Sequence, residues 1–330
     1  MPALTLSARS AIVSIAVAAA ISVSAARPAA AQAVFPDRTV RFIVPATPGT
    51  MIDLLPRMLG EKLSARWGQP VVVENRSGAA HNIGADAVAR AQPDGHTLLV
   101  TAPAPIVLSQ WLDPKQTTLA TSLVPVTVLA TFPQILVTNP KVPVKTFADW
   151  IAYAKANPGR MSYGSPGAGT TAHLAQEELM RALGIKLVHV PYQGMGPAIN
   201  DLLAGHIETM FAAAGTALPH LEQGKLRPIA VVGGGKLARL PDVPVISETL
   251  PTYNHTEWFA VLAPPQTPTA TVATLSQAIA ETLRSPDILS RLEQAFLQPV
   301  GKSPAEAAAF MENERQRWRA IVEARAGQSQ

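Results

Sequence analysis

Short apolar runs alternate with helix-like patterns in the first third of the chain. The run 40–44 ends at a cluster of breaker residues, Pro45-Ala46-Thr47-Pro48-Gly49, which predicts a strand followed by a loop. A helix should follow, because apolar residues recur on one helical face at Ile52, Leu55, Leu59 and Leu63. Further strands are predicted at 71–73 and 97–100, with a helix at 85–91 between them. This alternation indicates an α/β domain, and the valine run 71–73 is typical of a parallel strand buried on both faces.

A second α/β series fills the middle of the chain. Extended segments at 126–130 and 135–138 lead into a helix whose N-cap is predicted to be Thr146. Strands at 162–164, 187–190, 209–212 and 228–232 are then interleaved with helices at 171–183 and 197–204. After a further apolar strand at 258–263, helices close the chain, with predicted starts at Ser285-Pro286 and Ser303-Pro304.

The order of these series predicts two α/β lobes joined by two crossing strands, with a ligand cleft between them. Residues 34–131 together with 257–330 should form one lobe, and residues 132–256 the other. We expect hinge motion at the crossing segments near Phe132 and Glu257, because such motions are absorbed by a few positions.

The N-terminus has the features of a secretory signal peptide. Arg9 precedes an apolar run at 11–26 that is rich in Ala and Ser, and Ala31-Gln32-Ala33 is a small-x-small cleavage site. A membrane anchor is the alternative, but the run is shorter than the 18 or more residues that a spanning helix usually needs. We therefore expect export to the periplasm and cleavage after Ala33.

Composition narrows the function classes. The chain is 48% hydrophobic and 15% charged, as in globular proteins, and it has no cysteine, which excludes disulfides, thiolate metal sites and a lipid-modified cysteine anchor. Cleavage would remove Arg9 and Arg27 and no acid, so the net charge would fall from +4 to +2. Such a chain lacks the basic stripe of a nucleic-acid binder. The seven histidines show no metal-ligand spacing, so we expect neither a metal nor a cofactor.

Two glycine-bearing loops stand between a strand and a helix, and either could bind an anion. Free N–H groups and the positive end of the dipole at a helix N-terminus can hold an anion without Lys or Arg. The alternative for each loop is an ordinary tight turn. The candidate residues are Pro48, Gly49, Thr50, Met51 and Asp53 in the first loop, and Ser165, Gly167, Gly169, Thr170 and Thr171 in the second. Asp53 is the only acid in either loop, and at the first turn of a helix it more simply offsets the dipole and caps backbone donors.

Enzyme motifs are missing from the sequence. Ser165 lacks the first glycine of a G-x-S-x-G elbow, and Gly233-Gly234-Gly235-Lys236 is followed by Leu237, which rules out a P-loop. His173 could cap the turn at Thr171 or touch a ligand, and we favour the structural role. The sequence offers no recognisable pair of nucleophile and base, so we expect a binding protein and not an enzyme.

Many collinear segments resemble the Bug-type extracytoplasmic receptors of tripartite tricarboxylate transporters. The resemblance covers nearly all of the chain after the signal peptide. Its segments include Gly68-Gln69-Pro70-Val71-Val72-Val73-Glu74-Asn75-Arg76, Pro93-Asp94-Gly95-His96-Thr97-Leu98-Leu99, His189-Val190-Pro191-Tyr192-Gln193-Gly194 and Leu240-Pro241-Asp242-Val243-Pro244.

The resemblance implies a two-lobed periplasmic-binding-protein fold of the Venus flytrap, type II-like kind, with one ligand buried between the lobes. It implies a di- or tricarboxylate, an aromatic acid, an acidic amino acid or a nicotinate-like acid, held by backbone N–H groups and water from the two loops. The implied partners are this small carboxylate and the membrane subunits of a tripartite tricarboxylate transporter, with the receptor itself a monomer. Tyr192 belongs to one of the matching segments and joins the candidate ligand-binding residues.

Four departures from the family pattern predict a less polar cleft. The first loop has Gly49-Thr50-Met51 where further glycines are usual, and Met51 adds an adaptable apolar group. His81 ends a segment that is usually rich in glycine, and it is either a ligand contact or a solvated loop residue. Alanines follow Phe211 from Ala212 onward where polar residues are usual, and Gln193 replaces a frequent Lys. We therefore expect a carboxylate with an apolar or aromatic body and no free α-amino group.

Two other functions remain as alternatives. The same fold could serve a sensor subunit that presents its bound ligand to a signalling partner. A periplasmic enzyme acting on a carboxylate or ester is the less favoured alternative.

Overall fold

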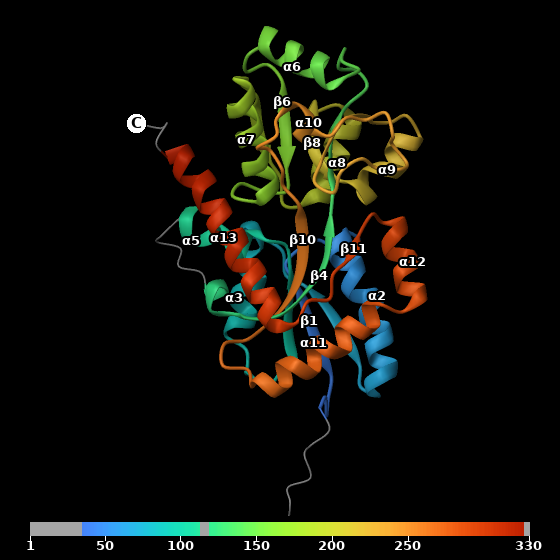
Figure 1. The fold of residues 1–330 in the computed structure, drawn as a ribbon, viewed down its shortest axis with the longest axis vertical. Helices are drawn as coiled ribbons and strands as arrows, with labels where there is room; N and C mark the ends of the chain where they lie inside the picture. The colour runs from blue at the N-terminus through green and yellow to red at the C-terminus, as the bar shows by residue number, and fades with distance from the viewer. Residues whose placement is uncertain (1–34, 113–118, 327–330) are drawn as a thin grey trace, which may run out of the picture. The chain divides into compact units, whose positions relative to one another are not determined.

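The computed structural model describes residues 35–112 and 119–326. The protein contains two β-sheets with helices packed around them (Figure 1). The predicted signal peptide 1–33 lies outside the described residues. From Arg38 onward the described chain forms one compact unit. No helix within the described ranges is long and apolar enough to cross a membrane.

The first sheet has six strands in the order β11-β4-β10-β3-β1-β2. Its strands are β1 (Val40–Val44), β2 (Val71–Asn75), β3 (Thr97–Thr101), β4 (Val124–Phe132), β10 (Glu257–Ala263) and β11 (Gln298–Pro299). β1 is parallel to β2 and β3, whereas β10 is antiparallel to β3 and β4. The helices from the same parts of the chain are α2 (Met51–Trp67), α3 (Asn82–Ala89), α4 (Ala104–Val107), α5 (Ser109–Leu112), α11 (Thr269–Leu283), α12 (Pro286–Gln294) and α13 (Pro304–Ala326). Two 3-10 turns accompany them, η1 (Ala79–His81) and η2 (Leu119–Ser122).

The second sheet has five strands in the order β7-β6-β8-β5-β9. They are β5 (Gln134–Thr138), β6 (Ser162–Ser165), β7 (Val188–Pro191), β8 (Thr209–Ala213) and β9 (Arg227–Val232). β6 is parallel to β7 and β8, and β5 is antiparallel to β8 and β9. The helices of this part are α6 (Phe147–Ala156), α7 (Thr171–Leu183), α8 (Met195–Ala204), α9 (Ala214–Glu222) and α10 (Ile246–Thr249).

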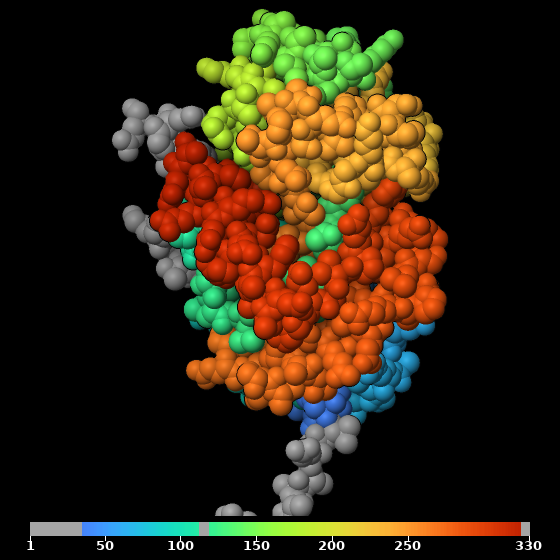
Figure 2. Space-filling view, viewed as in Figure 1, coloured from blue at the N-terminus to red at the C-terminus, as the bar shows by residue number. Residues whose placement is uncertain are grey.

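The chain passes twice between the sheets. Only Pro133 separates β4 of the first sheet from β5 of the second, and the chain returns to the first sheet at β10 (Figure 1). Glu257, the first residue of β10, pairs with Phe132, the last residue of β4, so the two crossing points are neighbours. The face drawn in Figure 2 is hollowed there, and part of the green chain is visible between the orange and red residues. The predicted two-lobed α/β architecture with crossing strands is confirmed.

Most predicted elements form close to their expected positions. α7 spans 171–183 as predicted, and Thr146 caps α6 in a reciprocal capping box with Asp149. The interpretation of 71–73 as a strand buried on both faces is wrong. β2 is the edge strand of its sheet, and Val72 is 48% exposed. A run of three valines suits an edge strand as well as a central one, because β-branched residues fit any pleated surface.

Candidate functional site

A cavity of about 250 Å³ lies where elements of both sheets meet. The first turns of α2, α7 and α8 border it, together with the two crossing segments. Its lining residues are Ala46, Gly49, Thr50, Met51, Ile52, His81, Ala102, Ala104, Phe132, Gln134, Pro166, Thr170, Thr171, Ala172, Gly194, Met195, Gly196, Ile199, Ala213, Thr216, Glu257 and Phe259. Six of the predicted site residues therefore meet at this cavity: Gly49, Thr50, Met51, His81, Thr170 and Thr171.

The walls of this cavity are mainly apolar, and no lining residue is Lys or Arg. The rings of Phe132 and Phe259, from the two crossing strands, lie 4.6 Å apart between centroids. Met51 and Met195 contribute flexible thioethers from two different helix starts. An apolar ligand body would find a complementary surface here, and any attraction for an anion must come from the backbone.

The starts of α2 and α7 supply that attraction. Thr50 and Thr170 are the N-caps of these helices, and both have extended backbone conformations. The first N–H groups of a helix have no partner inside it and carry the positive end of its dipole. Because both helix starts border one cavity, their free donors can converge on one carboxylate.

Several of the predicted donors are already engaged within their own loops. Gly49 N–H donates to Asp53 Oδ2 at 2.8 Å, and Gly169 N–H donates to His173 Nδ1 at 3.2 Å. Gly167 N–H donates to Ser165 Oγ at 3.2 Å, and Thr170 N–H donates to the Gly167 carbonyl. The helix positions that follow, Met51 and Ile52 in α2 and Thr171 and Ala172 in α7, keep donors available for a ligand.

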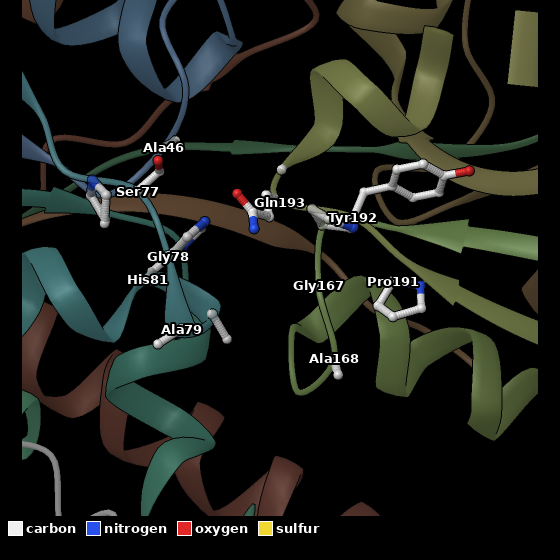
Figure 3. Close-up of a pocket in the computed structure, with 14 residues that line it drawn as sticks. Ala46, Ser77, Gly78, Ala79, His81, Gly167, Ala168, Pro191, Tyr192 and Gln193 are labelled. Carbon is white, nitrogen blue, oxygen red and sulfur yellow. The ribbon is translucent and has the colours of Figure 1, made fainter. Parts of the chain in front are cut away.

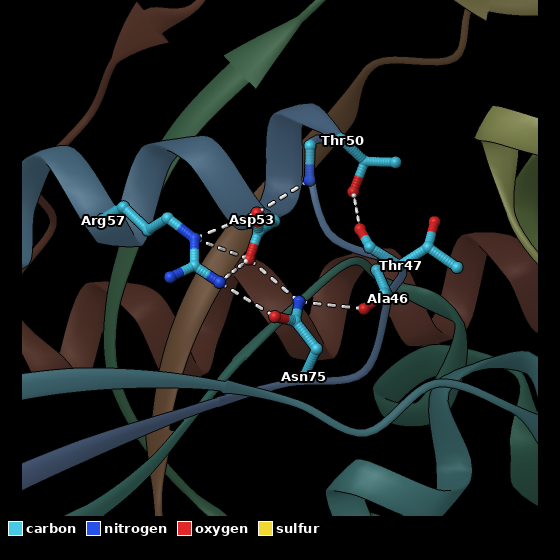
Figure 4. Close-up of polar contacts among 7 residues, drawn as sticks. Ala46, Thr47, Thr50, Asp53, Arg57 and Asn75 are labelled. Atoms are coloured by element: carbon cyan, nitrogen blue, oxygen red, sulfur yellow. Dashed lines mark hydrogen bonds and ion pairs between the residues drawn. The ribbon is translucent and has the colours of Figure 1, made fainter.

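Asp53 organises the first loop and does not line the cavity (Figure 4). Its carboxylate accepts hydrogen bonds from Gly49 N–H, from Arg57 Nη2 at 2.8 Å and from Asn75 Nδ2 at 2.9 Å. Asn75 also donates to the Ala46 carbonyl, which ties the end of β2 to the same loop. Burial alone would raise the pKa of Asp53, but the bonds from Arg57, Gly49 and Asn75 outweigh it and hold the pKa below its ordinary value. Asp53 is thus fully occupied in holding the loop.

The second loop is likewise built on buried polar contacts. Ser165 is 1% exposed, and its Oγ lies 2.7 Å from His189 Nε2. The His189 ring stacks on His173 with centroids 4.0 Å apart, and His173 Nε2 lies 3.2 Å from Glu177. This serine–histidine pair was not recognisable in the sequence, because strand pairing brings the two residues together. Neither residue of the pair lines a described pocket, and neither does His173, whose Nδ1 accepts the Gly169 N–H.

A second pocket of about 270 Å³ shares Ala46, His81, Pro166 and Gly194 with the first (Figure 3). The His81 and Gln193 side chains point toward each other across it, as Figure 3 shows. Gly167 and Tyr192 also line this pocket, but the Tyr192 ring points away from it. The Tyr192 hydroxyl donates to Asp201 at 2.7 Å, and burial together with this bond raises the pKa of Tyr192 to about 12.

The loop that carries His81 has an unusual backbone. Ala79, Ala80 and His81 all have positive φ, at 46°, 47° and 77°, a region that favours glycine. Such strain persists only where surrounding structure enforces it, and it is concentrated at ligand sites. Burial lowers the pKa of His81 to about 4, so its ring is neutral at pH 7. Its Nδ1 is buried and has no hydrogen-bond partner among the described residues.

Besides Asp53, Ser165 and His173, three further predicted site residues lie apart from both pockets. Pro48 is exposed and has no N–H to offer, whereas Ala212 is fully buried behind Ala213, which does line the first cavity. Gly169 serves the turn through its positive φ of 80°.

Two residues of the cavity, Glu257 and Gln134, were not predicted from the sequence as site residues. Both lie at the crossing points, both are buried, and both line the first cavity. Gln134 Oε1 has no hydrogen-bond partner among the described residues. Burial raises the pKa of Glu257 to about 7, although a hydrogen bond from Thr171 and the charge of Arg317 oppose this. The sequence does contain one indication that Glu257 is unusual, since it is an acid at the start of an otherwise apolar strand.

A sequence model of a family described as "Tripartite tricarboxylate transporter family receptor" matches residues 55–326. Protein BugT of Bordetella pertussis is 34% identical over 291 residues, which cover 87% of this chain and 89% of BugT.

Two solved structures with bound ligands are similar along most of their length. R. palustris Rpa4515 with adipate has a TM-score of 0.83 and 33% identity, and the match covers 88% of this chain and 97% of that one. MatC from Rhodopseudomonas palustris with bound malate has a TM-score of 0.82 and 29% identity, with 87% and 100% covered.

Proposed function

The chain belongs to the tripartite tricarboxylate transporter receptor family, and from this premise we propose that it captures one small carboxylate in the periplasm and delivers it to the membrane subunits of such a transporter. The family and its structural neighbours are solute-binding receptors and not enzymes.

The observation that carries the proposal is the convergence of two helix starts on one apolar cavity without Lys or Arg. A ligand carboxylate would accept hydrogen bonds from the free N–H groups of Met51 and Ile52 on one side and of Thr171 and Ala172 on the other. Each charge-assisted bond of this kind contributes about 1.5–3 kcal/mol. Because α2 and α7 flank different sheets, binding would also draw the two parts of the cleft together.

The remainder of the cavity suits an apolar or aromatic ligand body. Phe132, Phe259 and Met195 would contact it, and Ala213 leaves space beside them. A second polar group on the ligand could reach the adjoining pocket, where His81 and Gln193 offer neutral hydrogen-bonding groups. Two similar structures were solved with adipate and with malate, which supports a dicarboxylate with a short carbon body as the first class to test.

The lobes of the proposed receptor are residues 34–131 with 257–330, and residues 132–256. The sheet membership of the strands supports this division, since β5 to β9 lie in the second sheet and the other strands in the first. We place the protein in the periplasm after cleavage behind Ala33 and expect it to act as a monomer. The candidate cleavage site and the family's extracytoplasmic location support this placement.

A thermal-shift screen tests the proposal. Di- and tricarboxylates and aromatic acids would be compared with their carboxamides, which keep the shape but lose the charge. A ligand present at 100 times its Kd stabilises the folded state by about 2.7 kcal/mol, which corresponds to a rise in Tm of about 4 °C for a chain of this size. The proposal fails if no acid raises Tm, or if the acids and the amides raise it equally.

A further inference from the structure

One acid lies inside the carboxylate cavity. Of the residues that line it in the described chain, Glu257 alone carries a carboxyl group. It is 6% exposed and shares the cavity wall with the rings of Phe132 and Phe259. No lining residue is a cation that could neutralise it, so a carboxylate ligand would enter a cavity that already holds a carboxyl group.

The carboxyl group of Glu257 lies beside the proposed anion site. The Thr171 side chain, at the first position of α7, is hydrogen-bonded to Glu257. The same turn of α7 supplies two of the backbone donors assigned to the ligand. Two carboxylates that share one poorly solvated site cannot both stay ionised at low cost, so one of them holds a proton.

We propose that Glu257 takes up a proton when the ligand binds, so that the receptor captures a carboxylate anion together with one proton. This rests on the proposed function and deepens it, because it names the ionisation state that the site selects. Protonated Glu257 can donate a hydrogen bond to the ligand carboxylate, whereas ionised Glu257 repels it.

The charged groups around Glu257 are largely engaged with one another. Arg317 on α13 lies 3.2 Å from Glu314 and 3.3 Å from His255 Nδ1. His255 Nε2 in turn lies 2.5 Å from Glu178 of α7. Arg317, Glu314 and Tyr253 interact with Glu257 electrostatically. Glu178 and His255 contact one another next to Arg317, and His81 lines the same cavity as Glu257.

The direction of the pH dependence follows from this arrangement. Because burial raises the pKa of Glu257 to about 7 in the protein without ligand, the protonated form is abundant at neutral pH and scarce at pH 9. If only that form binds the anion, Kd is flat below pH 7 and rises by about tenfold per pH unit above it. His81 cannot produce this slope, because its pKa of about 4 leaves it neutral throughout the range. A ligand bound through an ammonium group would give the opposite slope.

Calorimetry on the full mature chain tests the inference, with adipate and benzoate as probes. Both are fully ionised above pH 7, so their own titration does not contribute. We expect Kd to rise by roughly 50-fold between about pH 7 and about pH 9, as one linked proton requires. Measured in two buffers of different ionisation enthalpy, binding should take up about half a proton at pH 7 and nearly one at pH 9.

Two variants identify the group. Glu257→Gln imitates the protonated acid, and its Kd should vary by less than about twofold over the same range. His81→Gln alters the other titratable residue of the cavity and should keep the slope of the wild type. If Glu257→Gln does not fold, proton uptake measured on the wild type still tests whether one proton binds together with the ligand.

The outcomes separate the two proposals. Binding without proton uptake, with a flat Kd, or with affinity that rises with pH overturns the role of Glu257 and leaves the carboxylate receptor intact. Persistence of the slope in Glu257→Gln overturns it as well. If no carboxylate binds at any pH, the proposed function fails, and the inference fails with it.

Discussion

Replacing Asp53 by Asn tests whether one buried carboxylate holds the first binding loop. Asp53 is 1% exposed, and three groups donate to it: Gly49 N–H, Arg57 and Asn75 (Figure 4). Asn has nearly the same shape, but it has one acceptor oxygen and two N–H donors. At least one of the three donors would then face another donor inside the loop.

The loss of folding stability in Asp53→Asn can be estimated from these contacts. A hydrogen bond to a charged group contributes about 1.5–3 kcal/mol, and a buried donor left without an acceptor adds to the loss. The Arg57 side chain is 44% exposed, so water replaces part of its interaction and its share is discounted. We expect Asp53→Asn to lower the free energy of unfolding by about 2–4 kcal/mol. Ligand affinity should also fall, because the start of α2 loses its support.

Urea unfolding monitored by tryptophan fluorescence measures the change. Asp287→Asn is the matched control, since Asp287 also lies in the first turn of a helix and pairs with Lys62 at 2.8 Å, but is exposed. The control should be nearly as stable as the wild type. Equal stability of Asp53→Asn and Asp287→Asn would show that the network in Figure 4 does not hold the loop.

The pH dependence gives an independent check. The pKa of Asp53 is lowered in the folded state, so its stabilising contribution is present above the unfolded pKa of about 3.9 and is lost as pH falls through the folded value. The stability difference between the wild type and Asp53→Asn should therefore be constant near neutral pH and shrink in acid. A difference that grows as pH falls below about 4 would refute this assignment.

Three further predictions concern binding, closure and export. Gly169→Val should weaken carboxylate binding by about ten- to hundredfold in calorimetry, because φ is positive at Gly169 and its turn precedes the donors of α7, whereas Arg181→Ala should change Kd little. The reverse ranking would refute a backbone site. Small-angle scattering should show a smaller radius of gyration with ligand, through hinge motion near Phe132 and Glu257, and an unchanged radius would count against closure. The intact mass of periplasmic protein should correspond to a chain that begins after Ala33, and a chain that keeps its first residue would contradict export by this signal.

The fold was predictable because its local signals are strong. Periodicity and breaker clusters located α2, β6 and α7, and Thr146 marked the start of α6. The edge position of β2 was not predictable, because the order of strands in a sheet depends on pairing across the whole chain. The valine run could not reveal that Val72 faces solvent.

The candidate site was predictable where it depends on a strand–loop–helix turn, as at Thr50 and Thr170. It was not predictable where distant segments meet. Glu257 lies 86 positions from Thr171 along the chain, and its raised pKa depends on burial that only the folded chain provides. The role of Asp53 could be foreseen from its place in the first turn, but its contact with Asn75 required the pairing of β1 with β2.

A crystal structure of the mature protein with adipate would show whether helix starts hold the ligand carboxylate. We predict that one ligand carboxylate lies between the starts of α2 and α7, within hydrogen-bonding distance of the N–H groups of Ile52 and Ala172 or their immediate neighbours, with no Lys or Arg side chain in contact with it. A carboxylate bound to a cationic side chain, or a ligand seated outside the cavity lined by Phe132 and Phe259, would refute binding by the two helix starts.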